Sequence, residues 1–271
     1  MSIVNGTEIA KEILERLKKE PQPKKFLAAI LVGDDPASTS FIRQKEKVGK
    51  ELGVDFRLHT FPADIAEEKL KEEILKITSD ENCGAVLVQL PLPSHIDRQH
   101  ILNCVPKEKD VDVLGKEASE MFFRGENSIH PPAVAVVEEI IDRLKLDVES
   151  LSVAVIGVGL LVGKPISLYF ESKVKKLDVF HRSSGDVKTQ LKDFNLIISG
   201  AGTAQLFSAK NLGSQAVVID FGYGDVDGKM AGDFDPAGAE VSSVSFTPTP
   251  GGTGPILVAK LYQNFYKLNM L

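Results

Sequence analysis

Short apolar runs alternate with amphipathic stretches along most of this chain. Short stretches rich in apolar residues predict strands at 26–32, 54–61, 84–90, 152–156, 177–180, 196–199 and 216–220. Apolar residues three or four apart predict helices at 8–20, 66–78, 133–144 and 256–268. A further helix is expected from Ser38 or Ser40 through Lys50, ending near Gly53. Because strands and helices alternate, we expect an α/β protein with a doubly wound parallel sheet.

Length and charge narrow the class of protein. The chain has 271 residues, a length that predicts two domains. Its net charge of −6 argues against nucleic acid as a partner. Cys83 and Cys104 have no metal-ligand spacing, so we expect reduced thiols in a cytoplasmic protein. We also expect neither a membrane span nor a signal peptide, because no apolar run is long enough and the N-terminus begins an amphipathic helix.

A glycine-rich turn follows the strand predicted at 152–156 and precedes a predicted helix. Glycines at such a turn let the backbone approach a pyrophosphate, which the helix N-terminus then binds. A tight turn without a ligand would show similar glycines, but the strand and helix around it favour a dinucleotide site. The candidate cofactor residues in this turn are Gly157, Val158, Gly159, Gly163, Lys164 and Pro165.

The next strand ends in His181, Arg182 and Ser183, with no acidic residue at its tip. An NAD site usually has an acidic residue there, which holds the ribose 2′-hydroxyl. A guanidinium suits a 2′-phosphate instead, so these three residues favour NADP. Arg182 as a solvated loop residue is the alternative.

Several polar side chains are candidates for catalysis. Phe41 and Lys45 are four residues apart on a predicted helix, so they share a face. Gln89 ends a predicted strand, where ligands bind in open α/β sheets, and Asp110 and Asp112 follow another strand-to-helix connection. An aromatic ring, an amine, an amide and a carboxylate could stack a flat ring and move protons. Lys45 could instead be one of several surface lysines on its helix.

These motifs resemble those of the bifunctional methylenetetrahydrofolate dehydrogenase/methenyltetrahydrofolate cyclohydrolase family. The matching stretches, in family order, lie at 32–38 with Lys45 downstream, 88–93, 109–112, 162–165 and 247–255. The resemblance implies an N-terminal three-layer α/β folate domain (1–120 plus 247–271) and a Rossmann-type domain (121–246). It also implies that the C-terminal helix packs back on the first domain.

The resemblance implies two reactions of one-carbon metabolism, which serves purine biosynthesis. The family oxidises 5,10-methylenetetrahydrofolate with NAD(P)+ and hydrolyses the methenyl product to 10-formyltetrahydrofolate. Lys45 matches the family's catalytic lysine, Gln89 the glutamine that orients it, and Asp112 the acid that holds the pterin. The loop containing Pro250, Gly251 and Gly252 matches the stretch that closes over the folate. A homodimer built through the cofactor domain is implied, and no metal site is expected from the histidine spacing.

Four departures from the family pattern keep alternatives open. Phe41 stands where the family has tyrosine, which leaves the ring to stack on the aminobenzoyl group but removes the phenol. Val113 replaces a glycine, residues 130–133 replace a Pro-Cys-Thr-Pro turn, and Val158-Gly159 replaces an Arg-Ser pair. The last change removes one expected ligand of the 2′-phosphate, so NAD remains possible. A monofunctional dehydrogenase, a monofunctional cyclohydrolase and a non-catalytic folate-binding protein are the alternative functions.

Overall fold

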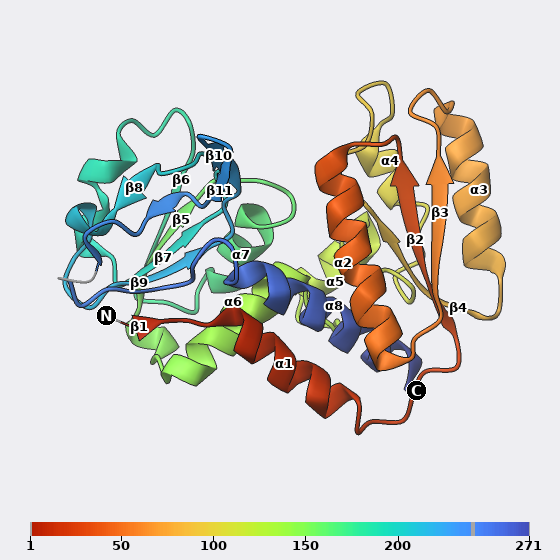
Figure 1. Cartoon of the computed structure of the whole chain (residues 1–271), viewed down its shortest axis with the longest axis horizontal. Helices are drawn as coiled ribbons and strands as arrows, with labels where there is room; N and C mark the ends of the chain where they lie inside the picture. Colours follow the sequence, from red (N-terminus) through yellow and green to blue (C-terminus); the bar gives the residue numbers. More distant parts are fainter. Residues whose placement is uncertain (1, 240–241, 271) are drawn as a thin grey trace. The chain divides into compact units, whose positions relative to one another are not determined.

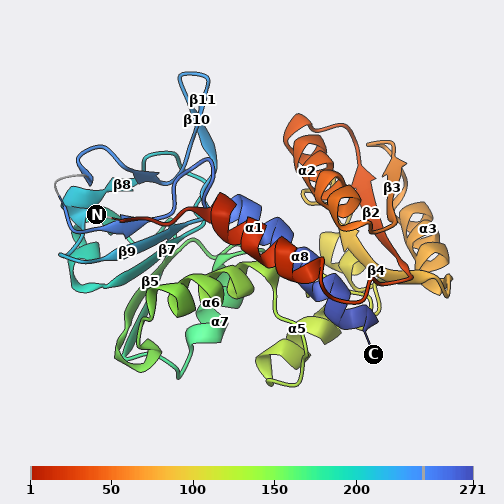
Figure 2. The same ribbon diagram turned by 60° about the horizontal axis from the view of Figure 1, so that its bottom comes forward.

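The computed structural model describes residues 2–239 and 242–270. The chain divides into two compact units (Figures 1 and 2). The three-stranded unit comprises Lys11–Pro132 and the residues from Val258 on, and the six-stranded unit comprises the residues up to Ala10 and Ala133–Leu257. Among the described residues, no helix is long and apolar enough to cross a membrane.

The three-stranded unit is built on a parallel sheet in the order β3-β2-β4. Its strands are β2 (Phe26–Val32), β3 (Phe56–Phe61) and β4 (Cys83–Val88), which confirms three predicted strands to within two residues at every end. Every residue of β2 and β4 is buried, as their continuous apolar runs predicted. The helices that contribute to this unit are α1 (Gly6–Leu17), α2 (Pro36–Leu52), α3 (Glu67–Ser79), α4 (Arg98–Leu102), α5 (Lys116–Phe123) and α8 (Thr253–Asn269).

Helix α2 follows β2 and has defined caps at both ends. The Asp35 carboxylate accepts a hydrogen bond from the Ser38 N–H at 2.7 Å, and Gly53 ends the helix with a φ of 70°. Figures 1 and 2 show α2 and α3 on opposite sides of the sheet, which is a three-layer arrangement. Because β3 and β4 lie on either side of β2, the direction in which successive strands are added to the sheet reverses at β2. Such switch points leave a crevice at the carboxyl ends of the strands.

The six-stranded unit is built on a wholly parallel sheet in the order β1-β13-β9-β7-β5-β6. Its strands are β1 (Ser2–Ile3), β13 (Ser245–Phe246), β9 (Val217–Asp220), β7 (Leu196–Ser199), β5 (Ser152–Ile156) and β6 (Lys176–Phe180). Helix α6 (Pro132–Leu144) precedes β5, and α7 (Gly163–Phe170) packs against β5 and β6. The two-domain α/β architecture with parallel sheets is therefore confirmed.

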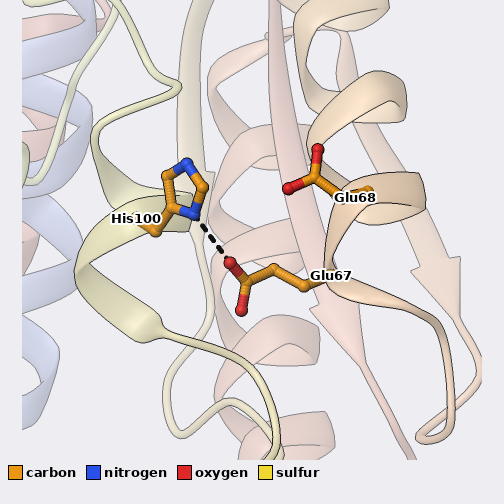
Figure 3. A group of neighbouring side chains, drawn as sticks. All are labelled: Glu67, Glu68 and His100. Atoms are coloured by element: carbon orange, nitrogen blue, oxygen red, sulfur yellow. Dashed lines mark hydrogen bonds and ion pairs between the residues drawn. The ribbon is translucent and has the colours of Figure 1, made fainter.

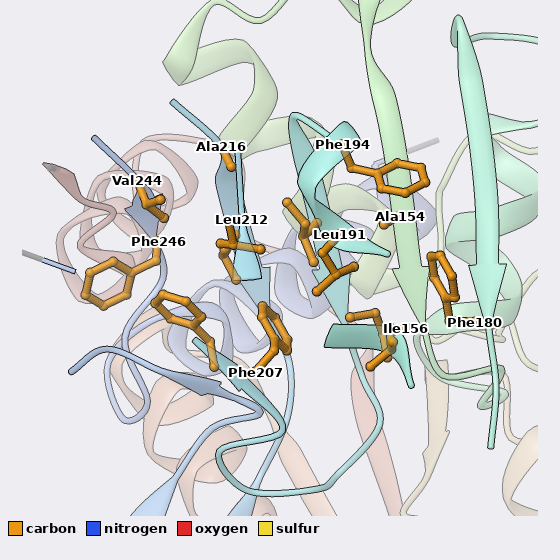
Figure 4. Close-up of a cluster of buried hydrophobic side chains, with 14 of the residues drawn as sticks. Ala154, Ile156, Phe180, Leu191, Phe194, Phe207, Leu212, Ala216, Val244 and Phe246 are labelled. Atoms are coloured by element: carbon orange, nitrogen blue, oxygen red, sulfur yellow. The ribbon is translucent and has the colours of Figure 1, made fainter. Parts of the chain in front are cut away.

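One face of this sheet is covered by short turns rather than by α-helices. The covering elements are the 3₁₀ turns η2 (Val187–Thr189), η3 (Leu191–Asp193) and η4 (Ala209–Asn211), with β8 (Phe207–Ser208) and β12 (Phe234–Asp235). Their side chains pack on Ala154 and Ile156 of β5 in an aromatic-rich cluster (Figure 4). Phe207 and Phe246 both lie near Phe234 there, with ring centroids 5.5 and 5.3 Å away. The remaining short elements are η1 (Val148–Ser150) and the hairpin β10 (Gly224–Val226) and β11 (Lys229–Ala231).

The division of the chain differs from the expected domain boundaries. Residues 247–257 were expected in the folate domain, but they belong to the six-stranded unit, as do the first ten residues. Strand pairing explains both assignments, because β1 pairs with β13 and β13 pairs with β9. The Asp220 N–H donates to Thr247 Oγ1, and Thr253 Oγ1 donates to the Asp220 carbonyl, each at 2.8 Å. Residues 121–132, which were expected in the cofactor domain, belong to the three-stranded unit.

Candidate active site and cofactor cavity

Lys45 and Gln89 meet at the carboxyl end of the three-stranded sheet. Lys45 lies on α2, and its Nζ donates to Gln89 Oε1 at 3.0 Å. The Gln89 side chain is itself fixed, because its Nε2 donates to the Leu90 carbonyl at 2.8 Å. Its backbone N–H donates to the Ile30 carbonyl of β2 at 2.9 Å, which ties it to the switch point. The structure thus brings together two side chains that the sequence placed on separate elements.

Asp112 completes the charged part of this site. It interacts electrostatically with Lys45, and both side chains are only partly exposed. Burial lowers the pKa of the Lys45 amine, and Asp112 opposes that shift. Burial likewise raises the pKa of Asp112, and Lys45 opposes that shift. An amine and a carboxyl that are both driven toward their neutral forms can exchange protons with a bound substrate.

The neighbouring Asp110 has a different role from Asp112. Its buried carboxylate accepts hydrogen bonds from the N–H groups of Leu114 and Gly115, at 2.9 and 2.7 Å. Burial raises the pKa of Asp110 to about 7, although these hydrogen bonds oppose the shift. Val113, which lies in the loop between Asp110 and Leu114, has a φ of 58°, a conformation that strains a β-branched residue. Asp110 therefore holds the loop that presents Asp112, and the position where the family has glycine keeps a glycine-like backbone.

The candidate substrate residues are divided between the two units. Phe41 lies one helical turn before Lys45 on α2 and is 40% exposed. Pro250, Gly251 and Gly252 lie in the six-stranded unit, in the loop after β13. The Gly251 carbonyl accepts a hydrogen bond from the Thr7 N–H at 3.2 Å, and a side chain at Gly252 would collide with the Pro248 carbonyl.

A cavity of about 810 Å³ lies at the carboxyl ends of β5, β6 and β7. Six of the predicted cofactor residues line it, namely Gly157, Val158, Gly159, His181, Arg182 and Ser183. The sheet order places β6 and β7 on either side of β5, so the cavity lies at the switch point of this sheet. Gly157 has a φ of 97°, which favours glycine at the turn. The location and lining are those of a dinucleotide site.

Gly163, Lys164 and Pro165 do not line this cavity. Gly163 begins α7, and a Cβ atom there would lie only 1.8 Å from the Gly157 carbonyl oxygen. This glycine therefore allows the helix to pack closely on the turn after β5. Lys164 is exposed, and its N–H donates to the Gly159 carbonyl at 3.0 Å. The three residues shape the turn rather than the cavity wall.

The tip of β6 is polar and exposed. Ser183 Oγ and His181 Nδ1 lie 2.7 Å apart, and the His181 N–H donates to Ser184 Oγ at 3.0 Å. Arg182 is exposed beside them and lines the cavity. These contacts leave the cavity rim with a guanidinium and hydroxyl groups, a donor set that suits a phosphate.

The sequence interpretation missed the opposite wall of the cavity. Gly200, Ala201 and Thr203 line it directly after β7. The fully buried Asp233 fixes this wall, because its carboxylate accepts the N–H groups of Ala201 and Thr203 at 2.8 and 2.7 Å. It also accepts the Ser199 hydroxyl at 2.6 Å. The signal was available in part, since Gly200 follows a predicted strand adjacent to the glycine turn.

Glu67, Glu68 and His100 form a surface cluster that could hold a metal ion (Figure 3). His100 Nδ1 lies 2.7 Å from Glu67 Oε1, and the Asp97 N–H donates to Glu67 Oε2 at 2.6 Å. These two hydrogen bonds lower the pKa of Glu67. The contacts account for Glu67 and His100 as a link between α3 and α4, without a metal.

Two protein-family models match the chain. Residues 4–112 match the tetrahydrofolate dehydrogenase/cyclohydrolase catalytic domain, and residues 131–270 match the NAD(P)-binding domain of the same family. Residues 113–130 fall between the two matches. A bifunctional protein FolD from Bacillus licheniformis is 34% identical over 273 residues, which cover 98% of this chain and 96% of that protein.

Solved structures agree with these matches. The chain is similar to a bifunctional FolD methylenetetrahydrofolate dehydrogenase/cyclohydrolase from Campylobacter jejuni, with a TM-score of 0.94 and 29% identity over 100% of this chain and 99% of that one. It is also similar to a Trypanosoma brucei methylenetetrahydrofolate dehydrogenase-cyclohydrolase in complex with NADP and an inhibitor. That TM-score is 0.90, with 26% identity over 99% of this chain and 97% of the other.

Proposed function

The chain belongs to the tetrahydrofolate dehydrogenase/cyclohydrolase family, and from this membership we propose how its residues perform two reactions. The first oxidises 5,10-methylenetetrahydrofolate to the 5,10-methenyl cation with NADP+. The second hydrolyses that cation to 10-formyltetrahydrofolate. The observation that carries the proposal is the hydrogen bond between Lys45 and Gln89 at the switch point of the three-stranded sheet.

Lys45 is the proposed proton carrier of the hydrolysis step. Water adds to the methenyl carbon and must lose a proton, and the ring nitrogen released by carbon–nitrogen cleavage must gain one. The lowered pKa of Lys45 makes its neutral form accessible, so the amine can accept the first proton and donate the second. Gln89 holds the amine in place through its Oε1 atom, and the proposed role of Asp112 is to bind the pterin.

NADP is the proposed cofactor of the oxidation step, and when bound it supplies the acceptor for the hydride. The residues fit a dinucleotide. Gly157 has a left-handed backbone at the turn, and the space beside Gly159 is open, since a Cβ there would meet no atom within 4 Å. Arg182, His181 and Ser183 would hold the 2′-phosphate at the cavity rim. Val158 contributes no charge there, so Arg182 carries the distinction between NADP and NAD.

Phe41, Pro250, Gly251 and Gly252 are the proposed substrate-binding residues. The exposed Phe41 ring offers an apolar face for the aminobenzoyl group. We also propose a cytoplasmic homodimer formed through the six-stranded unit, as the family resemblance implies. Light scattering coupled to size-exclusion chromatography tests the dimer.

A two-step assay tests the proposed function. Purified protein is given 5,10-methylenetetrahydrofolate with NADP+ or NAD+, and the absorbance of the methenyl product is followed as it forms and decays. We expect turnover with NADP+ followed by hydrolysis. Lys45→Met should reduce hydrolysis by about a hundredfold or more, whereas Lys47→Met on the same helix should not. Hydride transfer without hydrolysis, or the reverse, would indicate a monofunctional enzyme, and no turnover would favour a binding protein.

A further inference from the structure

The hydroxyl of Tyr262 reaches into the helical turn that follows Lys45. Tyr262 lies on α8 and is fully buried, and its Oη donates to the Lys45 carbonyl at 2.6 Å. Gly49, one turn further along α2, lies against the same hydroxyl. In a regular α-helix the carbonyl of residue 45 pairs with the N–H of residue 49. The phenol therefore binds the carbonyl that closes the helical turn between Lys45 and Gly49.

Gly49 makes room for this contact. A Cβ atom at position 49 would lie 2.5 Å from Tyr262 Oη and 3.3 Å from the Cβ of Phe56. Glycine in a helix interior is less favourable than alanine. Here the missing side chain is what admits the hydroxyl. Burial also raises the pKa of the Tyr262 phenol, so the hydroxyl keeps the proton that it donates.

The same helix fixes the backbone beside Asp112. Asn264 is buried, and its Nδ2 donates to the Val111 carbonyl at 3.0 Å and to the His130 carbonyl at 2.8 Å. Val111 directly precedes Asp112. Tyr262 thus holds the main chain of Lys45, and Asn264, two residues further along α8, holds the main chain next to Asp112.

We propose that Tyr262 and Asn264 are positioning residues, which set the relative placement of Lys45 and Asp112 through their main chains. This inference rests on the proton-transfer role proposed for Lys45. Neither residue needs to touch the substrate. Their effect is on geometry, and displacing a catalytic group by about 1 Å can reduce a rate a hundredfold.

The variant Tyr262→Phe tests the proposal because it removes one oxygen atom and keeps the ring. We expect kcat for methenyl hydrolysis to fall roughly tenfold, with KM changed by less than about twofold. The matched control is Tyr266→Phe, which removes the same atom from another buried tyrosine of α8 and should leave kcat unchanged. Rates are compared well below the unfolding temperature of each variant, so a loss of folded protein does not count as an effect on kcat.

A second variant approaches the same contact from the other side. Gly49→Ala displaces the hydroxyl while Tyr262 is retained, so it should lower kcat about as much as Tyr262→Phe. The double variant should be no slower than either single one, because both remove the same interaction. Additive losses, or an unchanged kcat in Tyr262→Phe, would overturn the positioning role.

A readout independent of turnover separates this inference from the proposed function. The pKa of Lys45 is measured by NMR of the lysine Nζ groups, with Lys45→Arg used to assign its signal. A loosened turn admits water to the amine, so its pKa should rise toward the ordinary lysine value in Tyr262→Phe but not in Tyr266→Phe. An inactive wild-type protein would contradict the proposed function alone. An unchanged Lys45 pKa in Tyr262→Phe would contradict the positioning role.

Discussion

Asp112 affects the proton affinity of Lys45 in a way that its removal would reveal. Its carboxylate raises the pKa of the amine and so opposes the larger lowering by burial. In Asp112→Asn the opposing charge is gone, so the pKa of Lys45 should fall further. In a plot of kcat for hydrolysis against pH, one limb reports the ionisation of Lys45. That limb should then move to lower pH. A shift to higher pH, or none, would show that the two groups are not coupled.

Arg182 is expected to distinguish the two nicotinamide cofactors. A hydrogen bond between charged groups contributes about 1.5–3 kcal/mol, so Arg182→Ala should raise the KM for NADP+ roughly ten- to a hundredfold. The KM for NAD+, which lacks the 2′-phosphate, should hardly change. Lys164→Ala is the matched control, because Lys164 is exposed near the glycine turn but does not line the cavity. Equal effects on both cofactors would exclude the 2′-phosphate as the ligand of Arg182.

Single residues differed in how well the sequence predicted them. The i, i+4 spacing placed Lys45 on a helix face, and the end of an apolar run placed Gln89 at a strand tip, so their meeting followed from local patterns. Tyr262 lies 217 residues from its partner Lys45. Its apolar ring fits any buried helix face, so no local pattern marks the hydroxyl as a hydrogen-bond donor to α2.

At the scale of elements, the junction between β5 and α7 depends on one glycine more than on another. A Cβ at Gly163 would lie 1.8 Å from the Gly157 carbonyl oxygen, whereas a Cβ at Gly159 would meet no atom within 4 Å. Gly163→Ala should therefore lower the melting temperature of the protein without cofactor by several degrees or more. Gly159→Ala should leave it within about 2 °C, because an exposed loop position tolerates a methyl group. Similar melting temperatures for the two variants would contradict the tight packing of α7 on the turn.

The long elements followed from the sequence because burial leaves a pattern of its own. The strands at Phe26–Val32, Ser152–Ile156 and Leu196–Ser199 were predicted to the residue, since each contains a continuous apolar run. The two-residue strands β1 and β13 were missed, because no periodicity can show in so short a segment. Helix α5 was also missed, and its residues lie in the stretch that neither family model matches.

At the scale of the whole molecule, the pairing of those short strands decides which residues belong together. Strand β1 joins the N-terminus to a sheet formed mostly by residues after 150. The final helix α8 begins in residues assigned to one unit and ends in residues assigned to the other. Sequence order alone predicted two contiguous blocks and a C-terminal return, since pairing between distant segments has no local signature.

Each unit also contains a buried carboxyl group with a raised pKa. Asp110 belongs to the three-stranded unit and Asp220 to the six-stranded unit, and burial raises the pKa of each to about 7. Asp220 accepts the N–H groups of Gly222 and Phe234 at 2.7 and 2.8 Å, and the neighbouring Asp233 raises its pKa further. Both native carboxyls therefore retain a proton at a pH where the unfolded chain has lost it.

The free energy of unfolding should consequently fall as the pH rises from 5.5 to 8. Across this window the native state binds more protons than the unfolded chain, and stability decreases with pH under that condition. Ionisation of each carboxyl lowers the free energy of unfolding by about 2 kcal/mol across this range. This corresponds to a decrease in melting temperature of roughly 4–8 °C for each carboxyl. Calorimetry across this pH range measures it, and either unit would show the effect if the two unfold separately. Asp110→Asn and Asp220→Asn should each make the dependence shallower. A melting temperature that stays constant or rises from pH 5.5 to 8 would show that both carboxyls are ionised in the native protein.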